Sequence, residues 1–342
     1  MRVVRICLLL QQLSVLALAA LTGSATLSNF SSLVIFGDSY TDDGIHAYTP
    51  EPDANLTTDS PDGGRPWSEY IQQYTGVKLY DYAVSGAVCD AVFSPSVRSG
   101  VKQNQVPQFL ADQAYGGNAS LVDAADETIY AIWIGTNDLG PGKSHRKTVS
   151  DAASPIVDYI HCIYEQLDVL YAAGARNFVL LNIAPLNFAP MYALAENGGV
   201  IDSHYWLNED QYSTNVTLVS EKMREYVALV NQVYDYQSPF QILVSDRYPA
   251  STFTIYNVHD LLSDIWHNPS DYLNGTVPYN VTSYITACGS ACDSDAVRDS
   301  YMWYDSLHPS EQTDRILARE FVNMVDGNGT WSQTWTSPSA SS

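Results

Sequence analysis

The stretch LVIFGDS, residues 33–39, places four large apolar residues directly before a turn. A short apolar run bounded by turn residues is typical of a strand buried on both faces of a parallel sheet. Because ligands bind at the carboxyl ends of such strands, the turn that contains Ser39 lies where a substrate would bind. Gly-Asp-Ser is also an ordinary turn sequence, so this stretch alone leaves Ser39 open as a turn residue or as a nucleophile.

Four further apolar runs have the same character, and helical patterns lie between them. The strands expected from these runs cover residues 79–84, 129–134, 178–183 and 240–244. The expected helices cover residues 66–74, 156–173, 218–234 and 309–325, the last with Pro309 at its first position. No internal repeat or linker divides the chain. The alternation of strand and helix predicts a single α/β domain, with a parallel sheet covered by helices on both faces.

Residues 1–25 have the features of a secretory signal peptide. Arg2 and Arg5 precede a mostly apolar run over residues 6–20, and small residues at 17–19 or 23–25 suit cleavage. The run is short and contains polar residues, which disfavours the alternative of a membrane anchor, and no later segment has the ~18 consecutive apolar residues of a span. We therefore expect a soluble secreted protein, with one domain over residues 26–326 and a flexible tail over 327–342.

The cysteines agree with an oxidising compartment. Of the five cysteines, Cys7 lies in the expected signal peptide, which leaves an even number in the mature chain. Four cysteines allow three pairings. Cys288 and Cys292 enclose only three residues, so we favour that pair and, by elimination, Cys89 with Cys162. A zinc site at Cys288 and Cys292 is the alternative, but no second Cys or His pair has a suitable spacing.

Glycosylation signals and net charge are also typical of a secreted protein. Seven Asn-x-Ser/Thr sequons favour eukaryotic secretion and place their loops at the surface. They begin at Asn29, Asn55, Asn118, Asn215, Asn274, Asn280 and Asn328. The formal net charge of −22 disfavours nucleic acid and anionic membranes as partners and favours neutral substrates, although solubility alone is an equally good reason for such a surface.

Three more polar clusters could carry chemistry. Asp305 and His308 are three residues apart, so one turn can place the carboxylate against the imidazole and orient it as a base, or can simply cap a helix. Asn137, in the turn GTND over residues 135–138, could donate its amide to an oxyanion. Gly86, in AVSGA over residues 83–87, could donate its backbone N–H, because glycine permits close approach. Each of the last two clusters alone is equally compatible with an ordinary turn.

Taken together and in this order, the four clusters resemble the four signature blocks of the GDSL/SGNH hydrolases. The resemblance extends from residue 36 to residue 308. It implies that Ser39 is the nucleophile, His308 the base and Asp305 the third member of a catalytic triad. It also implies an oxyanion hole made by Ser39, Gly86 and Asn137. The expected fold is a flavodoxin-like three-layer α/β/α sandwich with about five parallel strands, and neither a metal nor an organic cofactor is expected.

Residues in and near the first block indicate which branch of the family this chain resembles. Tyr40 stands where the founding motif has leucine, and together with residues 41–42 and the stretch GRPW at 64–67 it resembles the fungal acetylesterases of carbohydrate esterase family 16. This implies an esterase that removes acetate from acetylated sugars such as hemicellulose fragments, and we expect a monomer. Trp67 is a possible sugar contact.

Three alternatives on the same fold remain open. One is a lipase or phospholipase, which the acidic surface and the lack of a long apolar loop disfavour. Another is a catalytically silent carbohydrate-binding protein, which the intact Ser39, Asp305 and His308 disfavour. The last is an acyltransferase, which uses the same serine intermediate and is not separated from a hydrolase by sequence.

Overall fold

The computed structural model describes residues 30–45, 47–49, 60–61, 63–93, 99–115, 124–140, 156–201, 203–206 and 215–337. Within this part of the chain a central sheet of seven strands has the order β2-β3-β1-β4-β5-β6-β9. Neighbouring strands of the inner five are all parallel, which confirms the expected α/β fold with about five parallel strands. The inner strands are β1 (Ser32–Gly37), β3 (Lys78–Asp81), β4 (Thr128–Trp133), β5 (Asn177–Leu181) and β6 (Thr252–Tyr256).

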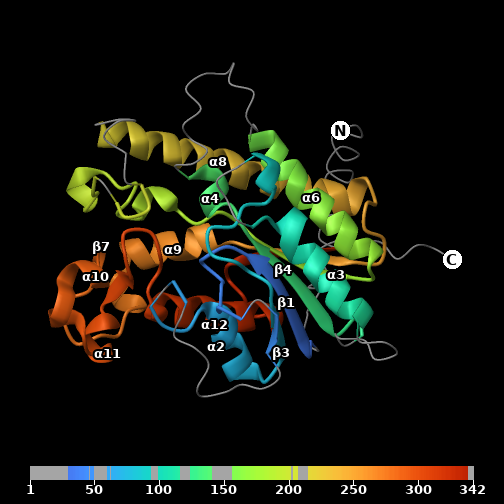
Figure 1. Ribbon diagram of the computed structural model, residues 1–342, viewed down its shortest axis with the longest axis horizontal. Helices are drawn as coiled ribbons and strands as arrows, with labels where there is room; N and C mark the ends of the chain where they lie inside the picture. The colour runs from blue at the N-terminus through green and yellow to red at the C-terminus, as the bar shows by residue number, and fades with distance from the viewer. Residues whose placement is uncertain are drawn as a thin grey trace, which may run out of the picture.

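Helices cover both faces of this sheet (Figure 1). On one face, α2 (Trp67–Thr75) packs against α12 (Glu311–Val325). The other face carries α3 (Val106–Tyr115), α6 (Ile156–Ala172) and α8 (Val216–Pro239). The remaining helices are α4 (Thr136–Leu139), α9 (Val258–His267), α10 (Ile285–Cys288) and α11 (Asp295–Arg298). The three layers are those of the expected sandwich.

Aromatic side chains fill the space between the sheet and its two helical layers. Every residue of β1 is buried, as its apolar sequence predicts. On one face Phe36 packs against Phe109 of α3, with ring centroids 5.8 Å apart. On the other face Trp67 of α2 packs against Trp133 of β4 and Phe321 of α12. Trp67 is fully buried, so it is a core residue and not a sugar contact.

The helix boundaries follow capping chemistry. The side chain of Asn215 accepts a hydrogen bond from the Leu218 N–H and begins α8, and Ser310 caps α12 by accepting from the Thr313 N–H. The last helix therefore begins at Glu311, two residues after the expected start at Pro309. Helix α2 ends at Gly76, whose positive φ of 74° is typical of a helix C-terminus.

The expectation of a strand over residues 240–244 is wrong. Phe240–Val244 forms a π-helical turn that continues α8 past Pro239, and the fifth parallel strand is β6. Phe240 and Val244 are exposed whereas Ile242 is buried, so the run has only one fully buried side chain. An apolar run of five residues does not by itself separate a strand from a helical segment.

The expectation of a flexible tail over residues 327–342 is also wrong for its described part. Ser332–Thr336 forms β9, which pairs antiparallel with β6 at the edge of the sheet. Trp331 and Trp335 pack against the core, and the hydroxyl groups of Thr254 and Thr334 lie 2.9 Å apart across the two strands. Two apolar anchors and a cross-strand pair therefore hold this segment, despite its polar composition. The opposite edge strand is β2 (Ala47–Thr49), antiparallel to β3.

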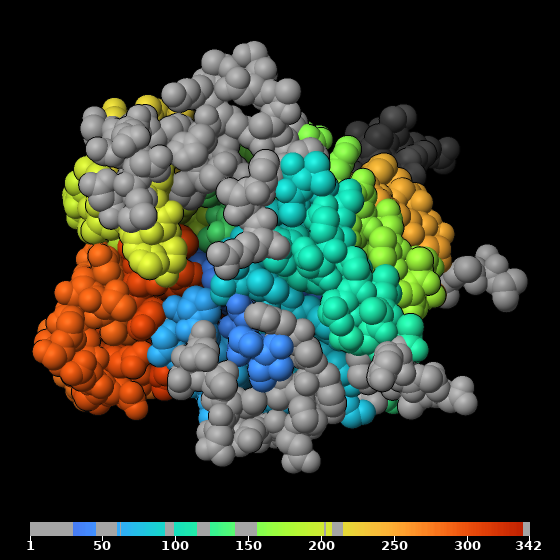
Figure 2. All heavy atoms as spheres, in the orientation of Figure 1, coloured from blue at the N-terminus to red at the C-terminus, as the bar shows by residue number. Residues whose placement is uncertain are grey.

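A small second sheet joins β7 (Asn280–Tyr284) and β8 (Tyr301–Trp303) beside the main body of the molecule. With α10 and α11 it forms one side of the surface in Figure 2, coloured orange. A disulfide between Cys288 and Cys292 lies here, and a second joins Cys89 to Cys162, which is the pairing favoured from the sequence.

Four of the seven sequons lie in the described residues. Asn215, Asn274 and Asn328 are exposed, whereas Asn280 is half-buried and accepts hydrogen bonds from the backbone N–H groups of Thr282 and Ser283. Asn29, Asn55, Asn118 and the expected signal peptide over residues 1–25 lie outside the described residues. No helix of the described part is long and apolar enough to cross a membrane.

Candidate active site

Ser39 lies in a tight turn at the carboxyl end of β1. The Asp38 carbonyl accepts hydrogen bonds from the N–H groups of Thr41 and Asp42 at 3.0 and 3.1 Å, which closes the turn. A Cβ on Gly37 would lie 2.6 Å from the Trp133 carbonyl oxygen, so only glycine allows β1 and β4 to approach at this point. The Ser39 side chain is 5% exposed. The turn is therefore rigid and presents the hydroxyl at the sheet edge where ligands bind.

His308 and Asp305 reach Ser39 from the loop between β8 and α12. The His308 Nε2 lies 2.8 Å from the Ser39 Oγ, and the His308 Nδ1 lies 3.0 Å from the Asp305 Oδ2. The Asp305 Oδ1 accepts hydrogen bonds from the N–H groups of Leu307 and His308, both at 2.8 Å. The Asp305 Oδ1 also lies 3.1 Å from the His308 Nδ1, so both carboxylate oxygens face the imidazole and Oδ1 shapes the loop as well.

The electrostatics of Asp305 favour its ionised form. Burial opposes ionisation, but the hydrogen bonds from His308 and Tyr205 and the proximity of the imidazole outweigh it, so that the pKa of Asp305 is below its ordinary value. A carboxylate that is charged at neutral pH can orient an imidazole and stabilise the imidazolium form.

The loop that contains Gly86 is held on both sides. The Asp42 Oδ2 accepts hydrogen bonds from the Ser85 N–H at 2.6 Å and from its hydroxyl at 2.5 Å. On the other side, the Asn137 Nδ2 donates to the Ala87 carbonyl at 2.9 Å. Gly86 itself has a positive φ of 78°, which favours glycine. The loop is thereby fixed relative to both the Ser39 turn and α4.

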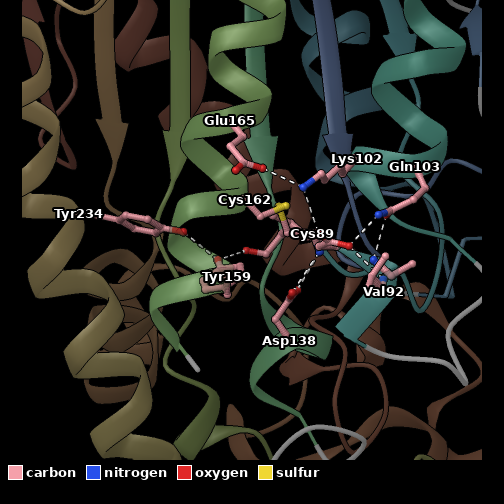
Figure 3. The surroundings of a disulfide bond; sticks show 12 residues. Cys89, Val92, Lys102, Gln103, Asp138, Tyr159, Cys162, Glu165 and Tyr234 are labelled. Atoms are coloured by element: carbon pink, nitrogen blue, oxygen red, sulfur yellow. Dashed lines mark hydrogen bonds and ion pairs between the residues drawn. A yellow bond between two sulfur atoms is a disulfide. The ribbon is translucent and has the colours of Figure 1, made fainter. Parts of the chain in front are cut away.

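The disulfide adds a third attachment to the same loop (Figure 3). Cys89 is bonded to Cys162 of α6, and its backbone N–H donates to the Asp138 Oδ1 at 3.0 Å. Lys102 lies 3.1 Å from an oxygen of Asp90 and 2.8 Å from one of Glu165, so it also links this region to α6. The loop after β3 is therefore tied to the helical layer as well as to the neighbouring turns.

The turn after β4 has a backbone conformation that requires glycine, and buried side chains hold it in place. Gly135 has a φ of 139°, and a Cβ there would lie 2.3 Å from the Ile183 Cδ1. The Tyr159 hydroxyl donates to the Ile134 carbonyl at 2.7 Å, and the Tyr234 hydroxyl donates to that of Tyr159 at 2.8 Å (Figure 3). Glycine at 135 and two buried tyrosines thus determine where α4 begins and where Asn137 projects.

The chain is similar in sequence to known proteins. The sequence profile of the GDSL-like Lipase/Acylhydrolase family matches residues 33–321. This chain belongs to that family. An acetylesterase from Hypocrea jecorina is 37% identical over 333 residues, which cover 90% of this chain and 92% of the relative. An acetylesterase from Thermothelomyces thermophilus is 25% identical over 332 residues, which cover 92% and 96% of the two chains.

A solved structure is also similar to this GDSL-family chain. It is of a mutant of an acetyl-xylooligosaccharide esterase from Geobacillus Stearmophilus, which is 15% identical, with 88% of this chain and 95% of that chain covered and a TM-score of 0.40. The family match and the acetylesterase relatives make the chain a carboxylic ester hydrolase.

The structure of this GDSL-family esterase brings the expected residues together in two groups. Ser39, His308 and Asp305 form one continuous hydrogen-bonded chain. Gly86 and Asn137 form the second group, because Asn137 binds the residue that follows Gly86. In the described part of the chain, the backbone N–H groups of Ser39 and Gly86 have no hydrogen-bond partner, which leaves both available to a ligand. No cluster of three or more His, Cys, Asp or Glu side chains in that part is arranged to hold a metal ion.

Asp38, next to the serine, has an unusual environment. Burial raises its pKa to about 7, and the negative charge of Asp138 contributes, while the backbone N–H groups of Tyr40, Gly135 and Thr136 oppose the rise. Its Oδ1 accepts from the Tyr40 N–H at 3.1 Å. Its buried Oδ2 has no hydrogen-bond partner in the described part of the chain, so Asp38 supports the Ser39 turn through Oδ1.

Tyr205 is a further residue of the site, which no sequence motif indicates. Its hydroxyl donates a hydrogen bond to the Asp305 Oδ2 at 2.7 Å, and its ring lies edge-on to that of His308 with centroids 5.0 Å apart. Tyr205 belongs to none of the four signature blocks and lies 100 residues before Asp305, so no local spacing points to it. Only the folded chain brings the two residues together.

Proposed function

We propose that this esterase is secreted and releases acetate from acetylated carbohydrates by a Ser-His-Asp acyl-enzyme mechanism. The observation that carries the proposal is the hydrogen-bonded chain from the Ser39 Oγ through His308 to Asp305, at 2.8 and 3.0 Å. A serine hydroxyl becomes an effective nucleophile when a base is positioned to take its proton. The separations lie within the range of a nucleophile with its base and of a base with its orienting group.

In the first step, the His308 Nε2 takes the proton of Ser39 while the Oγ attacks the carbonyl carbon of the ester. The tetrahedral intermediate collapses when the bond to the sugar oxygen breaks, and His308 gives that oxygen its proton. Water then attacks the carbonyl carbon of acetyl-Ser39, with His308 again as base. The bond to the Ser39 Oγ breaks, His308 returns its proton to that oxygen, and acetate leaves. Asp305 remains ionised throughout and stabilises the imidazolium form of His308.

The oxyanion is held by the backbone N–H groups of Ser39 and Gly86 and by the amide of Asn137. Two observations support these roles: the two backbone groups have no partner in the described chain, and the Asn137 Nδ2 has a second hydrogen beyond the one that binds Ala87. The attachments of the 85–89 loop keep these donors in place before substrate binds. Preorganised donors of this kind supply a large part of the rate enhancement in acyl transfer.

Acetate and a sugar are the substrate parts we favour. Two relatives that match nine-tenths of the chain are named acetylesterases. The net charge of −22 favours a neutral substrate over an anionic lipid surface. Secretion is supported by the signal-like residues 1–25, by the sequons and by two disulfides, which persist in oxidising compartments.

We expect activity on p-nitrophenyl esters to be highest on acetate and to fall as the acyl chain lengthens. The measurement is kcat/KM for acetate, butyrate, octanoate and palmitate, together with acetate release from acetylated xylo-oligosaccharides. Activity that rises with chain length would favour a lipase. Transfer of acetate to an added sugar in preference to water would favour an acyltransferase, and inactivity on every ester would favour a binding protein.

The oxyanion hole gives a second prediction. Asn137→Ala should lower kcat by about 10²–10³-fold, the usual effect of removing one oxyanion donor. KM should change little, because the interaction forms mainly in the transition state. The lost bond to Ala87 is a structural effect, which a thermal melt of the same variant reports separately. An unchanged kcat would exclude Asn137 from the oxyanion hole.

A further inference from the structure

Tyr205 contacts both partners of the Asp305–His308 pair. Its hydroxyl donates to the Asp305 Oδ2 at 2.7 Å, the same oxygen that faces the His308 Nδ1 at 3.0 Å. Its ring packs edge-on against the His308 imidazole at an interplanar angle of 72°. Tyr40 also contacts the imidazole, with ring centroids 5.8 Å apart. Of these two tyrosines, Tyr205 is the one whose hydroxyl donates to Asp305, whereas the Tyr40 hydroxyl donates to the Leu307 carbonyl.

The segment over residues 203–206 is anchored to the catalytic loop independently of the Tyr205 hydroxyl. The hydroxyl groups of Ser203 and Ser306 lie 2.8 Å apart in a buried contact, and Ser306 lies between Asp305 and His308 in sequence. The Tyr205 N–H donates to the Ser203 Oγ at 3.2 Å, and Trp206 is buried against Tyr192. These contacts fix the backbone on either side of Tyr205, so its position is determined by the fold.

The second support for this loop comes from the neighbouring segment. The Met191 N–H donates to the Ser306 carbonyl at 2.8 Å. Met191, Ser203 and Tyr205 thus contact the 305–308 loop through both backbone and side chains, although none of them lies in a signature block. The signature blocks of the family account for the presence of Ser39, Asp305 and His308. They do not account for the contacts between this segment and the catalytic loop.

The two carboxylate oxygens of Asp305 accept hydrogen bonds from different additional donors. Its Oδ1 accepts from two backbone N–H groups, which determine the position of the carboxylate within its own loop, and also lies 3.1 Å from the His308 Nδ1. Its Oδ2 is held by His308 and by the Tyr205 hydroxyl. The Asp305 side chain is 14% exposed, so little water is available to replace a lost donor.

We propose that Tyr205 is a positioning residue of the triad, which acts through Asp305: its hydroxyl fixes the Oδ2 opposite the His308 Nδ1, and its ring limits the tilt of the imidazole. The inference rests on the proposed Ser-His-Asp mechanism and adds a fourth member to it. Tyr205 does not touch the reacting atoms. Its contribution is the orientation of the carboxylate, and therefore of the base that takes the Ser39 proton.

The first test is Tyr205→Phe, which removes the hydroxyl and keeps the ring. Tyr205 is 40% exposed, so the variant retains its packing and its melting temperature. We expect kcat on p-nitrophenyl acetate to fall roughly tenfold, as for the loss of one hydrogen bond to a charged group, with KM within about twofold of the wild type. The matched control is Tyr236→Phe on α8, whose side chain is 75% exposed, and its kinetics should be unchanged.

The second test separates positioning from substrate binding by a double-mutant cycle with Asp305→Ala. If Tyr205 acts through Asp305, Tyr205→Phe has no further effect once the carboxylate is gone. If Tyr205 binds the substrate, its tenfold loss persists in the Asp305→Ala background and appears partly in KM, which overturns the inference. A fluorogenic acetate ester keeps the low residual rates measurable, and Ser39→Ala gives the baseline.

The same series distinguishes failure of this inference from failure of the proposed mechanism. Full activity in Asp305→Ala would overturn the triad and the role of Tyr205 together. Loss of activity in Asp305→Ala with a wild-type kcat in Tyr205→Phe would leave the triad intact and remove Tyr205 from it.

Discussion

Ser39→Ala is expected to lower kcat for ester hydrolysis by about 10⁶-fold, the effect found when a serine nucleophile or its base is removed. Without the Oγ no acyl-enzyme can form, and the base 2.8 Å away has no hydroxyl to deprotonate. Any residual rate would come from water attacking a substrate held in the oxyanion hole. The measurement is single-turnover hydrolysis of p-nitrophenyl acetate, with labelling of Ser39 by a serine-directed fluorophosphonate located by peptide mapping.

The fold should survive this change, because only a hydroxyl is lost at a nearly buried position. The melting temperature therefore serves as the control, with Ser270→Ala as a matched exposed serine that should retain full activity. The double variant Ser39→Ala/His308→Ala should be no slower than either single variant, because residues that act as a unit are not additive. Substantial hydrolysis by Ser39→Ala, or fluorophosphonate labelling at another residue, would rule out Ser39 as the nucleophile.

The parts of the structure that sequence analysis predicted share one physical basis. Ser39 and Asn137 follow the strongly apolar strands β1 and β4, Gly86 follows β3, and the parallel arrangement brings the carboxyl ends of these strands to one edge of the sheet. A parallel sheet by itself predicts that these residues lie close together, because they follow the carboxyl ends of neighbouring strands. No knowledge of side-chain contacts is needed. Asp305 and His308 are close in sequence, so their contact is local.

What could not be predicted depends on contacts between distant segments. The run at 240–244 is apolar enough for a strand, but α8 continues through Pro239 and only the packing of Ile242 shows which structure forms. Strand β9 has a polar sequence that pairs because β6 offers a free edge and Trp335 reaches the core. Tyr205 is 100 residues from Asp305, and its segment has no motif that would reveal the contact.

Asp305→Asn is expected to lower kcat strongly as well, and the hydrogen bonds of Asp305 give the reason. The Oδ1 of Asp305 accepts two backbone hydrogen bonds at 2.8 Å, from Leu307 and His308. An amide NH₂ cannot accept these bonds, so the asparagine would keep its carbonyl oxygen at this place. The NH₂ would then occupy the position of Oδ2, 3.0 Å from the His308 Nδ1, as a donor, beside the carbonyl oxygen at 3.1 Å from the same nitrogen.

A donor at that position favours the wrong tautomer of His308. It stabilises an Nδ1 that accepts, in competition with the carbonyl oxygen 3.1 Å away, and so raises the share of imidazole whose proton is on Nε2, where it points at the Ser39 Oγ. A protonated Nε2 cannot take the serine proton, so kcat should fall by about 10⁴-fold with the geometry otherwise intact. Asp305→Ala leaves the imidazole free to adopt either tautomer and should therefore retain more activity than Asp305→Asn. The comparison of kcat for the two variants at neutral pH measures this difference directly. If Asp305→Asn proved the more active of the two, control of the tautomer would not be the function of Asp305, and its charge alone would account for its effect.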